Sequence, residues 1–372
     1  MSRIPGKIVV KEFAFINDYS TDRATRIDAW PLIEGMSLYE NVFMHTMSGV
    51  AKVLDSYNLY STLPITSNTY VKITLQDPTT GESVYGLYRI YKVSAIEQES
   101  PKVQTYMIHF ASSELFLSRM VRVSKHVLGN IPTAARDIHN QISAKPINID
   151  ADATKTDLYI PFRPGLEAID FLAKNAKWKA TVPDYAYWET LHGFNFRSLS
   201  SCMIQNQEHD FATSTPMSGN IANTFNYSDY IKIDEIEVKQ TFDEAEMLYD
   251  GYSGTTVYTY DPLAGLSYVH QLGADPLSYT KTISANFLDY ESISKRAILF
   301  NQIRDSRYYI QVPGLLSRSA GDVANVTVYN GNNMNIKDTT LSGKRLILGI
   351  AHVISRDEYT QNITLGDYYL GN

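Results

Sequence analysis

Hydrophobic and polar positions alternate along the first third of the chain in the pattern of β-strands. Residues 71–75 alternate strictly, which predicts a strand with one buried face. The longer run 84–96 carries apolar side chains on both faces, so we expect core to cover one face and a neighbouring element or subunit to cover the other. A polar turn at 97–102 leads into a return strand at 106–110. These segments together predict an antiparallel β-module.

The hydrophobic period becomes helical in the middle of the chain. Apolar residues at helical spacing predict a helix over 131–142, with Thr133 placed to cap it. A second helix is predicted over 164–176, because it starts with proline, has an acidic residue early and has lysine late. Short strands are expected between Trp178 and Trp188. This middle region therefore predicts a small α/β domain.

The pattern is less regular in the following region. Residues 205–226 are rich in Ser, Thr, Asn and Met, which predicts a loop. Alternation returns at 231–238, and glycines and prolines then mark an irregular excursion near 250–290. A helix is predicted near 291–304, and strands resume after it.

The first and last thirds of the chain share an order of elements. Between 63 and 110, and again between 316 and 365, a polar loop, a short strand, a second polar loop, a long strand, a polar turn and a return strand follow one another. Residue identity hardly repeats. Two interpretations are open: any two antiparallel meanders look alike, or the chain contains two copies of one barrel module.

The second interpretation predicts an α+β, mainly β fold with two similar antiparallel β-barrel modules and an inserted α/β domain. We expect the first module at 1–115, the insertion at 116–225, and the second module at 226–372. Three such chains would place six modules around one axis. A ring of this kind can meet a six-fold object on one face and a three-fold object on the other.

Composition agrees with a folded assembly protein. The chain has 372 residues, and its 33 basic and 40 acidic side chains give a net charge of −7. Its 27 tyrosines favour strands and interfaces. Because no stretch approaches the roughly 20 apolar residues that span a bilayer, and the N-terminus lacks the apolar core of a signal peptide, we expect a cytoplasmic chain without membrane insertion.

Candidate catalytic groups are few. The single cysteine, Cys202, would need His192 or His209 as a base, but no surrounding signature supports that pairing. His109 and His352 fall inside predicted strands, where a core or seam position is the expectation. The acidic residues Asp243, Glu244 and Glu246 are adjacent in sequence, which favours a solvated face or an intersubunit salt bridge. Nucleophile-elbow, zinc-helix and phosphate-loop motifs are absent from the sequence, so we predict no enzymatic activity, no cofactor and no metal.

The order of elements resembles that of the baseplate hub proteins of contractile-tailed bacteriophages. The blocks that carry the resemblance run from Leu63 to Phe110, from Tyr159 to Trp178 and from Pro313 to Tyr369. The resemblance implies tail-tube-like barrels and a homotrimer that forms a pseudo-six-fold ring. It also implies binding to the hexameric tail tube protein, the trimeric spike protein and other baseplate proteins, with double-stranded DNA passing through the channel without specific binding. The expected location is the virion baseplate, after assembly in the bacterial cytoplasm.

The long strands of the two modules are the expected subunit interface, because a seam would cover their outer faces. The residues predicted to line it are Tyr85, Leu87, Tyr91, Val93, Leu346, Leu348, Ile350 and Val353. The alternative functions are a hub or tail-tip protein of a non-contractile tail, a cell-wall hydrolase, and a carbohydrate-binding β protein. Since Asn372 comes soon after the last predicted strand, we expect no appended lytic domain.

Overall fold

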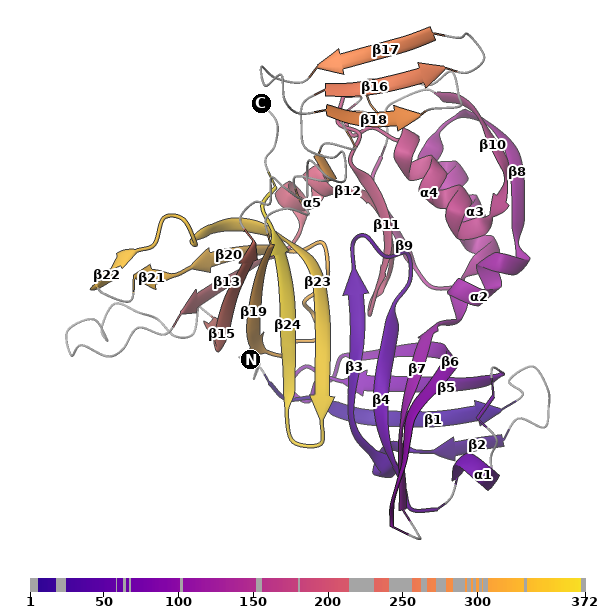
Figure 1. Cartoon of the computed structure of the whole chain (residues 1–372), viewed down its shortest axis with the longest axis vertical. Helices are drawn as coiled ribbons and strands as arrows, with labels where there is room; N and C mark the ends of the chain where they lie inside the picture. The colour runs from indigo at the N-terminus through magenta and orange to yellow at the C-terminus, as the bar shows by residue number, and fades with distance from the viewer. Residues whose placement is uncertain are drawn as a thin grey trace.

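Two β-barrels and an inserted domain make up the protein in a computed structural model (Figure 1). The structure describes residues 6–17, 25–57, 59–62, 65–66, 68–100, 103–151, 156–179, 181–213, 231–240, 256–261, 266–271, 279–283, 292, 296, 299–300, 303, 307–330 and 333–368. The predicted fold class, mainly β with two similar barrels and an α/β insertion, is confirmed.

The first barrel is a curved sheet whose two ends meet. Its strands are β1 (Val9–Asn17), β2 (Thr25–Asp28), β3 (Ile33–Asn41), β4 (Ser48–Asp55), β5 (Thr69–Gln76), β6 (Ser83–Ser100) and β7 (Val103–Ser112). They pair in the order β3-β4-β7-β6-β5-β1-β2. A 3-10 turn, η1 (Trp30–Leu32), carries the chain from β2 directly into β3, so the β2–β3 segment borders β1 at its start and β4 at its end. The short helix α1 (Leu59–Thr62) lies between β4 and β5.

The second barrel closes in the same way. Its strands are β13 (Glu208–Thr213), β14 (Ile231–Ile233), β15 (Glu235–Gln240), β19 (Arg307–Pro313), β20 (Val323–Thr327), β23 (Gly343–Ser355) and β24 (Tyr359–Gly366). The consecutive strands β14 and β15 form one segment that pairs with β13 at its start and with β19 at its end. A small hairpin, β21 (Tyr329–Asn330) and β22 (Asn333–Lys337), extends from β20.

The two barrels have the same cyclic strand order. When β2–β3 and β14–β15 each count as one strand, and strands are numbered along the chain, both barrels run 2-3-6-5-4-1. The predicted repeat corresponds to the last three strands of each barrel. One difference is that β13 is parallel to both neighbours, whereas β1 is antiparallel to both of its neighbours. The second barrel is therefore a copy in topology, with its first strand reversed.

The barrels are joined edge to edge. Strand β23 pairs antiparallel with β3, from Gly349 opposite Asn41 to Ser355 opposite Gly35. At this seam the Glu40 carboxylate lies 3.0 Å from Nε2 of His352, and both side chains are fully buried. Nδ1 of His352 lies 2.8 Å from the Tyr359 hydroxyl. Of the two positions expected for His352, the structure shows the core one, at the contact between the two barrels of the chain. His109 on β7 is half-buried, and its Nε2 lies 2.8 Å from the Ser94 hydroxyl.

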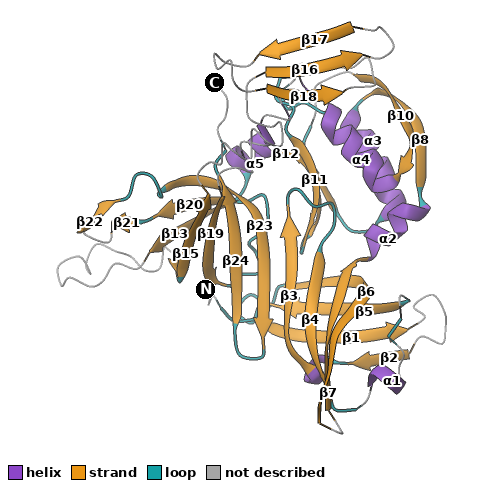
Figure 2. Cartoon of the chain, in the orientation of Figure 1, coloured by secondary structure: helices purple, strands orange, loops and turns teal. Residues whose placement is uncertain are grey.

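The inserted domain holds most of the helices (Figure 2). Its elements are α2 (Ser113–Met120), β8 (Arg122–Gly129), α3 (Ile131–Ile142), β9 (Ile147–Ile149), β10 (Thr156–Pro164), α4 (Gly165–Asn175), β11 (Tyr185–Thr190), β12 (Gly193–Ser198) and α5 (Leu199–Gln205). Helices α3 and α4 share one core with the β8–β10 ribbon and with the β9–β12–β11 sheet. Both helices were predicted, but Asn130 caps α3 by accepting from the Thr133 amide, and Pro164 is the N-cap of α4.

The prediction of a loop over 205–226 is wrong for its first part. Residues 208–213 form β13, which pairs with β20 in the second barrel, and buried Phe211 anchors this strand in the barrel core. The domain boundaries themselves stay a prediction, and we propose that the second barrel begins near β13. Residues 214–230, like Asp243, Glu244 and Glu246, lie outside the described residues.

The excursion predicted near 250–290 contains regular strands. They are β16 (Thr256–Asp261), β17 (Leu266–Gln271) and β18 (Tyr279–Ile283), which form a small three-stranded sheet at the top of Figure 1. The described residues of the predicted helix near 291–304 are helical; they are 292, 296, 299, 300 and 303.

Candidate functional site

The outer side of β6 carries exposed aromatic residues. Tyr85 and Tyr91 are 73% and 53% exposed, and Leu87 between them is half-buried. A bulge between Ile90 and Lys92 breaks the alternation, because it inserts one extra residue opposite β7. We call Tyr85, Leu87 and Tyr91 the β6 face.

Val93 does not belong to the β6 face, contrary to the sequence prediction. After the bulge Val93 stands opposite Ile108, whose side chain is fully buried, and Val93 packs against the core of the first barrel. Strict alternation placed it outside. The bulge shifts the residues that directly follow it by one position and so turns the Val93 side chain inward.

The predicted interface residues of β23 are covered by the chain itself. Leu346 and Leu348 are at most 2% exposed and pack in one cluster with Leu199 and Met203 of α5. Ile350 is equally buried but faces the interior of the second barrel. Val353 is half-buried. Both faces of β23 are therefore covered, as expected. The barrel interior covers one face and α5 of the inserted domain covers the other. Leu346, Leu348 and Ile350 thus offer no surface to another subunit.

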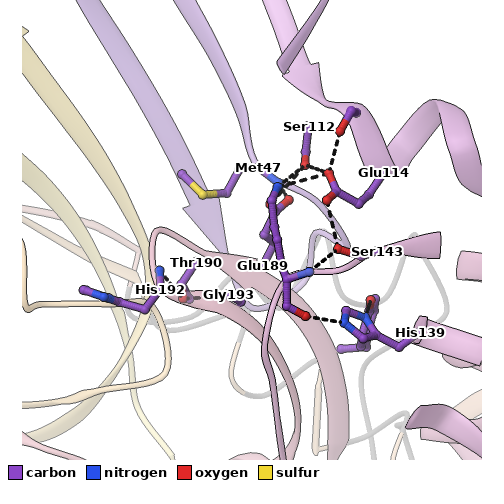
Figure 3. Close-up of polar contacts among 12 residues, drawn as sticks. Met47, Ser112, Glu114, His139, Ser143, Glu189, Thr190, His192 and Gly193 are labelled. Carbon is purple, nitrogen blue, oxygen red and sulfur yellow. Dashed lines mark hydrogen bonds and ion pairs between the residues drawn. The ribbon is translucent and has the colours of Figure 1, made fainter. Parts of the chain in front are cut away.

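A pocket of about 190 Å³ opens next to Tyr85. It lies between β6 and the turn that joins β11 to β12, where the first barrel meets the inserted domain. Glu189, Lys145 and His192 contribute to its wall, together with Thr190. Figure 3 shows Met47, Thr190, His192 and Gly193 beside Glu189 in this region.

A buried polar cluster lies against this pocket, and we call it the Lys145 cluster: Ser112, Glu114, Ser143, Lys145 and Glu189. The ammonium of Lys145 lies 2.6 Å from Glu189 Oε1 and 3.0 Å from Glu114 Oε2. The hydroxyl of Ser112 donates to Glu114 at 2.5 Å and contacts Glu189 at 3.0 Å. The hydroxyl of Ser143 donates to the other oxygen of Glu114 at 2.9 Å (Figure 3).

These five residues come from separate elements of two domains. Ser112 ends β7 of the first barrel and Glu114 begins α2, whereas Ser143 and Lys145 follow α3 and Glu189 lies on β11. The remaining oxygen of Glu189 accepts from the backbone amide of Met47, in the connection between β3 and β4, at 2.9 Å. The cluster thus ties the first barrel to the inserted domain at several points.

The electrostatics of the Lys145 cluster distinguish its two carboxylates. Burial by itself would raise the pKa of Glu114, but Lys145 and the Ser112 hydroxyl outweigh it and lower that pKa. Burial raises the pKa of Glu189, and the charge of Glu114 adds to the rise despite Lys145. Burial would lower the pKa of Lys145, yet the two carboxylates raise it. On acidification Glu189 therefore takes up a proton before Glu114.

Every carboxylate oxygen of the cluster accepts a hydrogen bond from the chain itself. Two acidic groups and one ammonium leave a net charge of −1, held by hydroxyl and amide donors. Because these contacts connect elements of the first barrel with elements of the inserted domain, the arrangement is that of a structural joint. The sequence offered one signal for it, since Glu189 is a charged residue inside a strand whose side chains are all buried.

Among the described residues, the two histidines considered as bases for Cys202 have other partners. Cys202 is fully buried, and burial raises the pKa of its thiol to about 12, which keeps it protonated. Nε2 of His192 lies 2.9 Å from the Leu316 carbonyl, and His209 pairs with Asp322 at 3.2 Å. Ser253, around which the sequence lacks the nucleophile-elbow pattern and predicts a turn, lies outside the described residues.

Metal-ligand clusters and membrane-spanning helices are both absent from the described part of the structure. The described His, Cys, Asp and Glu residues include no group of three or more arranged to hold a metal ion. Where the structure describes helices, none has the length and apolar character to cross a bilayer.

The fold is similar to solved structures of phage tail proteins. A tail protein from Neisseria meningitidis MC58 gives a TM-score of 0.59 at 13% identity, over 96% of this chain and 97% of that chain. A 43 kDa tail protein of prophage MuSo2 from Shewanella oneidensis gives 0.55 at 10% identity, over 96% and 98%. This chain has the fold of a phage tail protein.

The same tail-protein fold occurs in a secretion system. A component of the type VI secretion system of E. coli, described as structurally similar to the T4 bacteriophage tail proteins gp27 and gp5, gives a TM-score of 0.50 at 9% identity over 98% of this chain and 77% of that chain. No protein-family model matches the sequence, and no curated protein matches it. The resemblance to hub proteins is therefore confirmed at the level of the fold.

Proposed function

We propose that this protein is the baseplate hub of a contractile phage tail, a homotrimeric ring that joins the hexameric tail tube to the trimeric spike. The observation that carries the proposal is the pair of barrels with one cyclic strand order, joined edge to edge in a single chain. Three such chains present 3 × 2 = 6 similar barrels. That count lets a three-fold object imitate six-fold symmetry on the side of the tube and remain three-fold on the side of the spike.

The β6 face is the part of the predicted interface that remains accessible. Two exposed tyrosines and a half-buried leucine on one strand are the composition that stable interfaces favour. Obligate interfaces commonly bury more than about 2,000 Å². We place the β6 face inside the contact between neighbouring subunits, with surrounding residues of the first barrel completing it.

Charge supports passage of DNA through such a ring. Three chains carry 3 × −7 = −21 charges. An acidic assembly repels phosphates, so double-stranded DNA would slide through the channel without specific binding. The proposed role is mechanical and without catalysis, and its place is the virion baseplate after assembly in the bacterial cytoplasm.

Light scattering coupled to gel filtration, with negative-stain microscopy, tests the ring. We expect a trimer, formed by the chain alone or after spike protein is added, and ring-shaped particles. Tyr85→Glu combined with Tyr91→Glu should yield monomers, because charges buried at a seam stay unpaired. Tyr57→Glu is the matched control, since Tyr57 is also an exposed tyrosine of the first barrel but lies outside the β6 face. A wild-type monomer under all of these conditions would contradict the proposal.

The same ring would also serve a non-contractile tail. The two roles differ in the neighbouring genes, because a contractile tail requires a sheath protein. A sheath gene encoded beside this one would support the contractile role, and a tape-measure and tail-tip set without a sheath would support the alternative.

A further inference from the structure

The pocket next to Tyr85 lies where another molecule would cover the β6 face. Tyr85 belongs both to the β6 face and to the pocket wall, and its side chain is 73% exposed. The volume of about 190 Å³ is smaller than the roughly 300–1,000 Å³ of typical small-molecule sites. The pocket therefore suits a single side chain of a macromolecular partner better than a cofactor.

Lys145 argues against an anion as the occupant of this pocket. Its ammonium donates to the Ser112 hydroxyl at 3.1 Å, to Glu114 at 3.0 Å and to Glu189 at 2.6 Å. An ammonium has three donors, so all three are already engaged within the chain. An anion in the pocket would have to displace one of these contacts.

The charge around the pocket is negative. The wall contains Lys145 and Glu189, and the ion-pair partners of the wall residues are Glu114, which contacts Lys145, and Glu82, which faces His192. These three carboxylates against one ammonium give 1 − 3 = −2 with His192 neutral. The pocket therefore favours a cation by charge complementarity.

His192 and Glu82 leave a gap at the rim of the pocket that one donor group would bridge. Nε2 of His192 lies 2.9 Å from the Leu316 carbonyl oxygen, so Nε2 carries the proton and Nδ1 of the neutral ring is an acceptor. Nδ1 lies 3.9 Å from Oε1 of Glu82, which is too long for a hydrogen bond. A cationic group placed between these two acceptors could donate to both of them.

Aromatic rings in the wall favour a guanidinium over an ammonium. Tyr85 and Tyr88 both line the pocket. A guanidinium stacks on aromatic rings, and its planar fork of donors can reach two acceptors at once. Burial raises the pKa of the Tyr88 hydroxyl well above its ordinary value, and the charges of Glu189 and Glu114 raise it further, as expected for a wall that favours cations.

We propose that this pocket holds an arginine side chain of the neighbouring copy of this chain in the ring. The guanidinium would stack on Tyr85 and bridge Nδ1 of His192 and the carboxylate of Glu82. The inference rests on the proposed function, because the neighbouring copy that covers the β6 face also covers the pocket. Since the β11–β12 turn supplies part of the wall, the inserted domain would take part in the subunit contact.

Dissociation of the ring on dilution, followed by mass photometry of the full-length protein, tests the pocket. Glu82→Lys places a cation where the arginine would bind, so it should raise the concentration at which half of the rings dissociate at least about tenfold. Glu34→Lys is the matched control, because Glu34 is an exposed carboxylate on β3 outside the pocket wall, and it should leave this concentration unchanged. The side chains of Glu82 and Glu34 are 40% and 57% exposed, so both variants should keep the wild-type melting temperature.

Electron cryo-microscopy of the ring at side-chain resolution identifies the occupant. We expect an arginine of the neighbouring copy within hydrogen-bond distance of Glu82 and His192. An empty pocket in a trimer, a residue of another type in the pocket, or a Glu82→Lys ring as stable as the wild type would overturn the inference and leave the ring in place. A Glu82→Lys variant that keeps the ring but loses binding of a different protein would also overturn it, because the pocket would then belong to that partner. A wild-type monomer, even with spike protein added, would instead contradict the proposed ring and the inference with it.

Discussion

Lys145 is the centre of a buried joint in which one ammonium holds two carboxylates together. Two carboxylates within 3.0 Å of one ammonium would repel each other without it, because little solvent reaches them. The hydroxyls of Ser112 and Ser143 complete the coordination of Glu114. Buried charged groups of this kind stabilise the fold only when all of their partners are present. Removing one group leaves the others buried and unpaired, which lowers the free energy of unfolding by more than the ion pair contributed to it.

Lys145→Met should therefore destabilise the protein in a way that depends on pH. Without the ammonium the pKa values of Glu114 and Glu189 both rise above their unfolded values, so the protonated forms favour the folded state. We expect a loss of about 3–5 kcal/mol in the free energy of unfolding near neutral pH, shrinking as the pH falls through the raised pKa values. Urea unfolding followed from about pH 8 to pH 5 measures this.

Two further variants make the Lys145 result specific. Lys125→Met removes a solvent-exposed ion pair with Asp137 and should cost no more than about 1 kcal/mol at any of these pH values. Glu189→Gln added to Lys145→Met removes one of the two opposed charges and should weaken the pH dependence. A deficit that stays constant across the range would show that Lys145 acts only through packing.

Strands β6 and β23 show how one sequence pattern can have two structural causes. Both strands are long and apolar on two sides, and both were expected to lie under a subunit seam. Residues Leu346 and Leu348 of β23 are covered by α5, whereas the outer side of β6 stays exposed at Tyr85 and Tyr91. Apolar residues on both faces of a strand indicate that each face is buried or can form a contact. They do not indicate which element or subunit covers it.

The sequence predicted regular strands and helices better than it predicted irregularities such as a β-bulge or a short polar strand. The strands near 71–75, 84–96 and 346–354 and the two central helices were visible because their periodicity extends over several turns or pairs. The bulge in β6 that turns Val93 inward was not, because it depends on pairing with β7. Strand β13 was missed because its polar residues resemble a loop and only tertiary contacts around Phe211 reveal it.

The Lys145 cluster was equally invisible from the sequence. Ser112 and Glu189 are 77 positions apart, and Lys145 and Glu189 are 44 apart, so no local motif joins them. Their proximity follows from the docking of the inserted domain on the first barrel. Sites assembled from single residues of several elements become apparent only once the fold is known.

The turn between β11 and β12 depends on a glycine. Gly193 has φ +127°, a conformation that other residues rarely adopt, and a Cβ there would lie 2.5 Å from the Pro146 carbonyl oxygen. Gly193→Ala should therefore destabilise the inserted domain by more than about 2 kcal/mol, through strain and a clash with rigid backbone. Thermal unfolding followed by circular dichroism measures the change.

Gly129→Ala is the matched control for the turn. Gly129 also has a positive φ, +104°, but a Cβ at this position would have no heavy atom within 4 Å. The control should carry the cost of backbone strain alone, about 1–3 kcal/mol, and so be clearly milder than Gly193→Ala. Equal losses in the two variants would mean that the contact with Pro146 relaxes without cost.

The three parts of the molecule share cores, so they should behave as one unit. Trp188 of β11 is almost completely buried in a cluster with Val323 and Leu346 of the second barrel, and its indole N–H donates to the Ala320 carbonyl at 3.0 Å. The Lys145 cluster joins the same inserted domain to the first barrel, and the β3–β23 pairing joins the barrels to each other. Each part is thus held by both of the others.

We expect the wild-type protein to unfold in a single calorimetric transition, and Trp188→Ala to separate the inserted domain from the second barrel. Truncating a buried tryptophan costs about 3–5 kcal/mol, and here the loss falls on the contact between the two parts. The variant should show a broadened or divided transition, because weaker coupling lets the parts melt independently. Trp178→Ala is the control, since Trp178 packs at the edge of the inserted domain's own core. It should lower the melting temperature while leaving one transition, and two transitions in the wild type would contradict the shared-core argument.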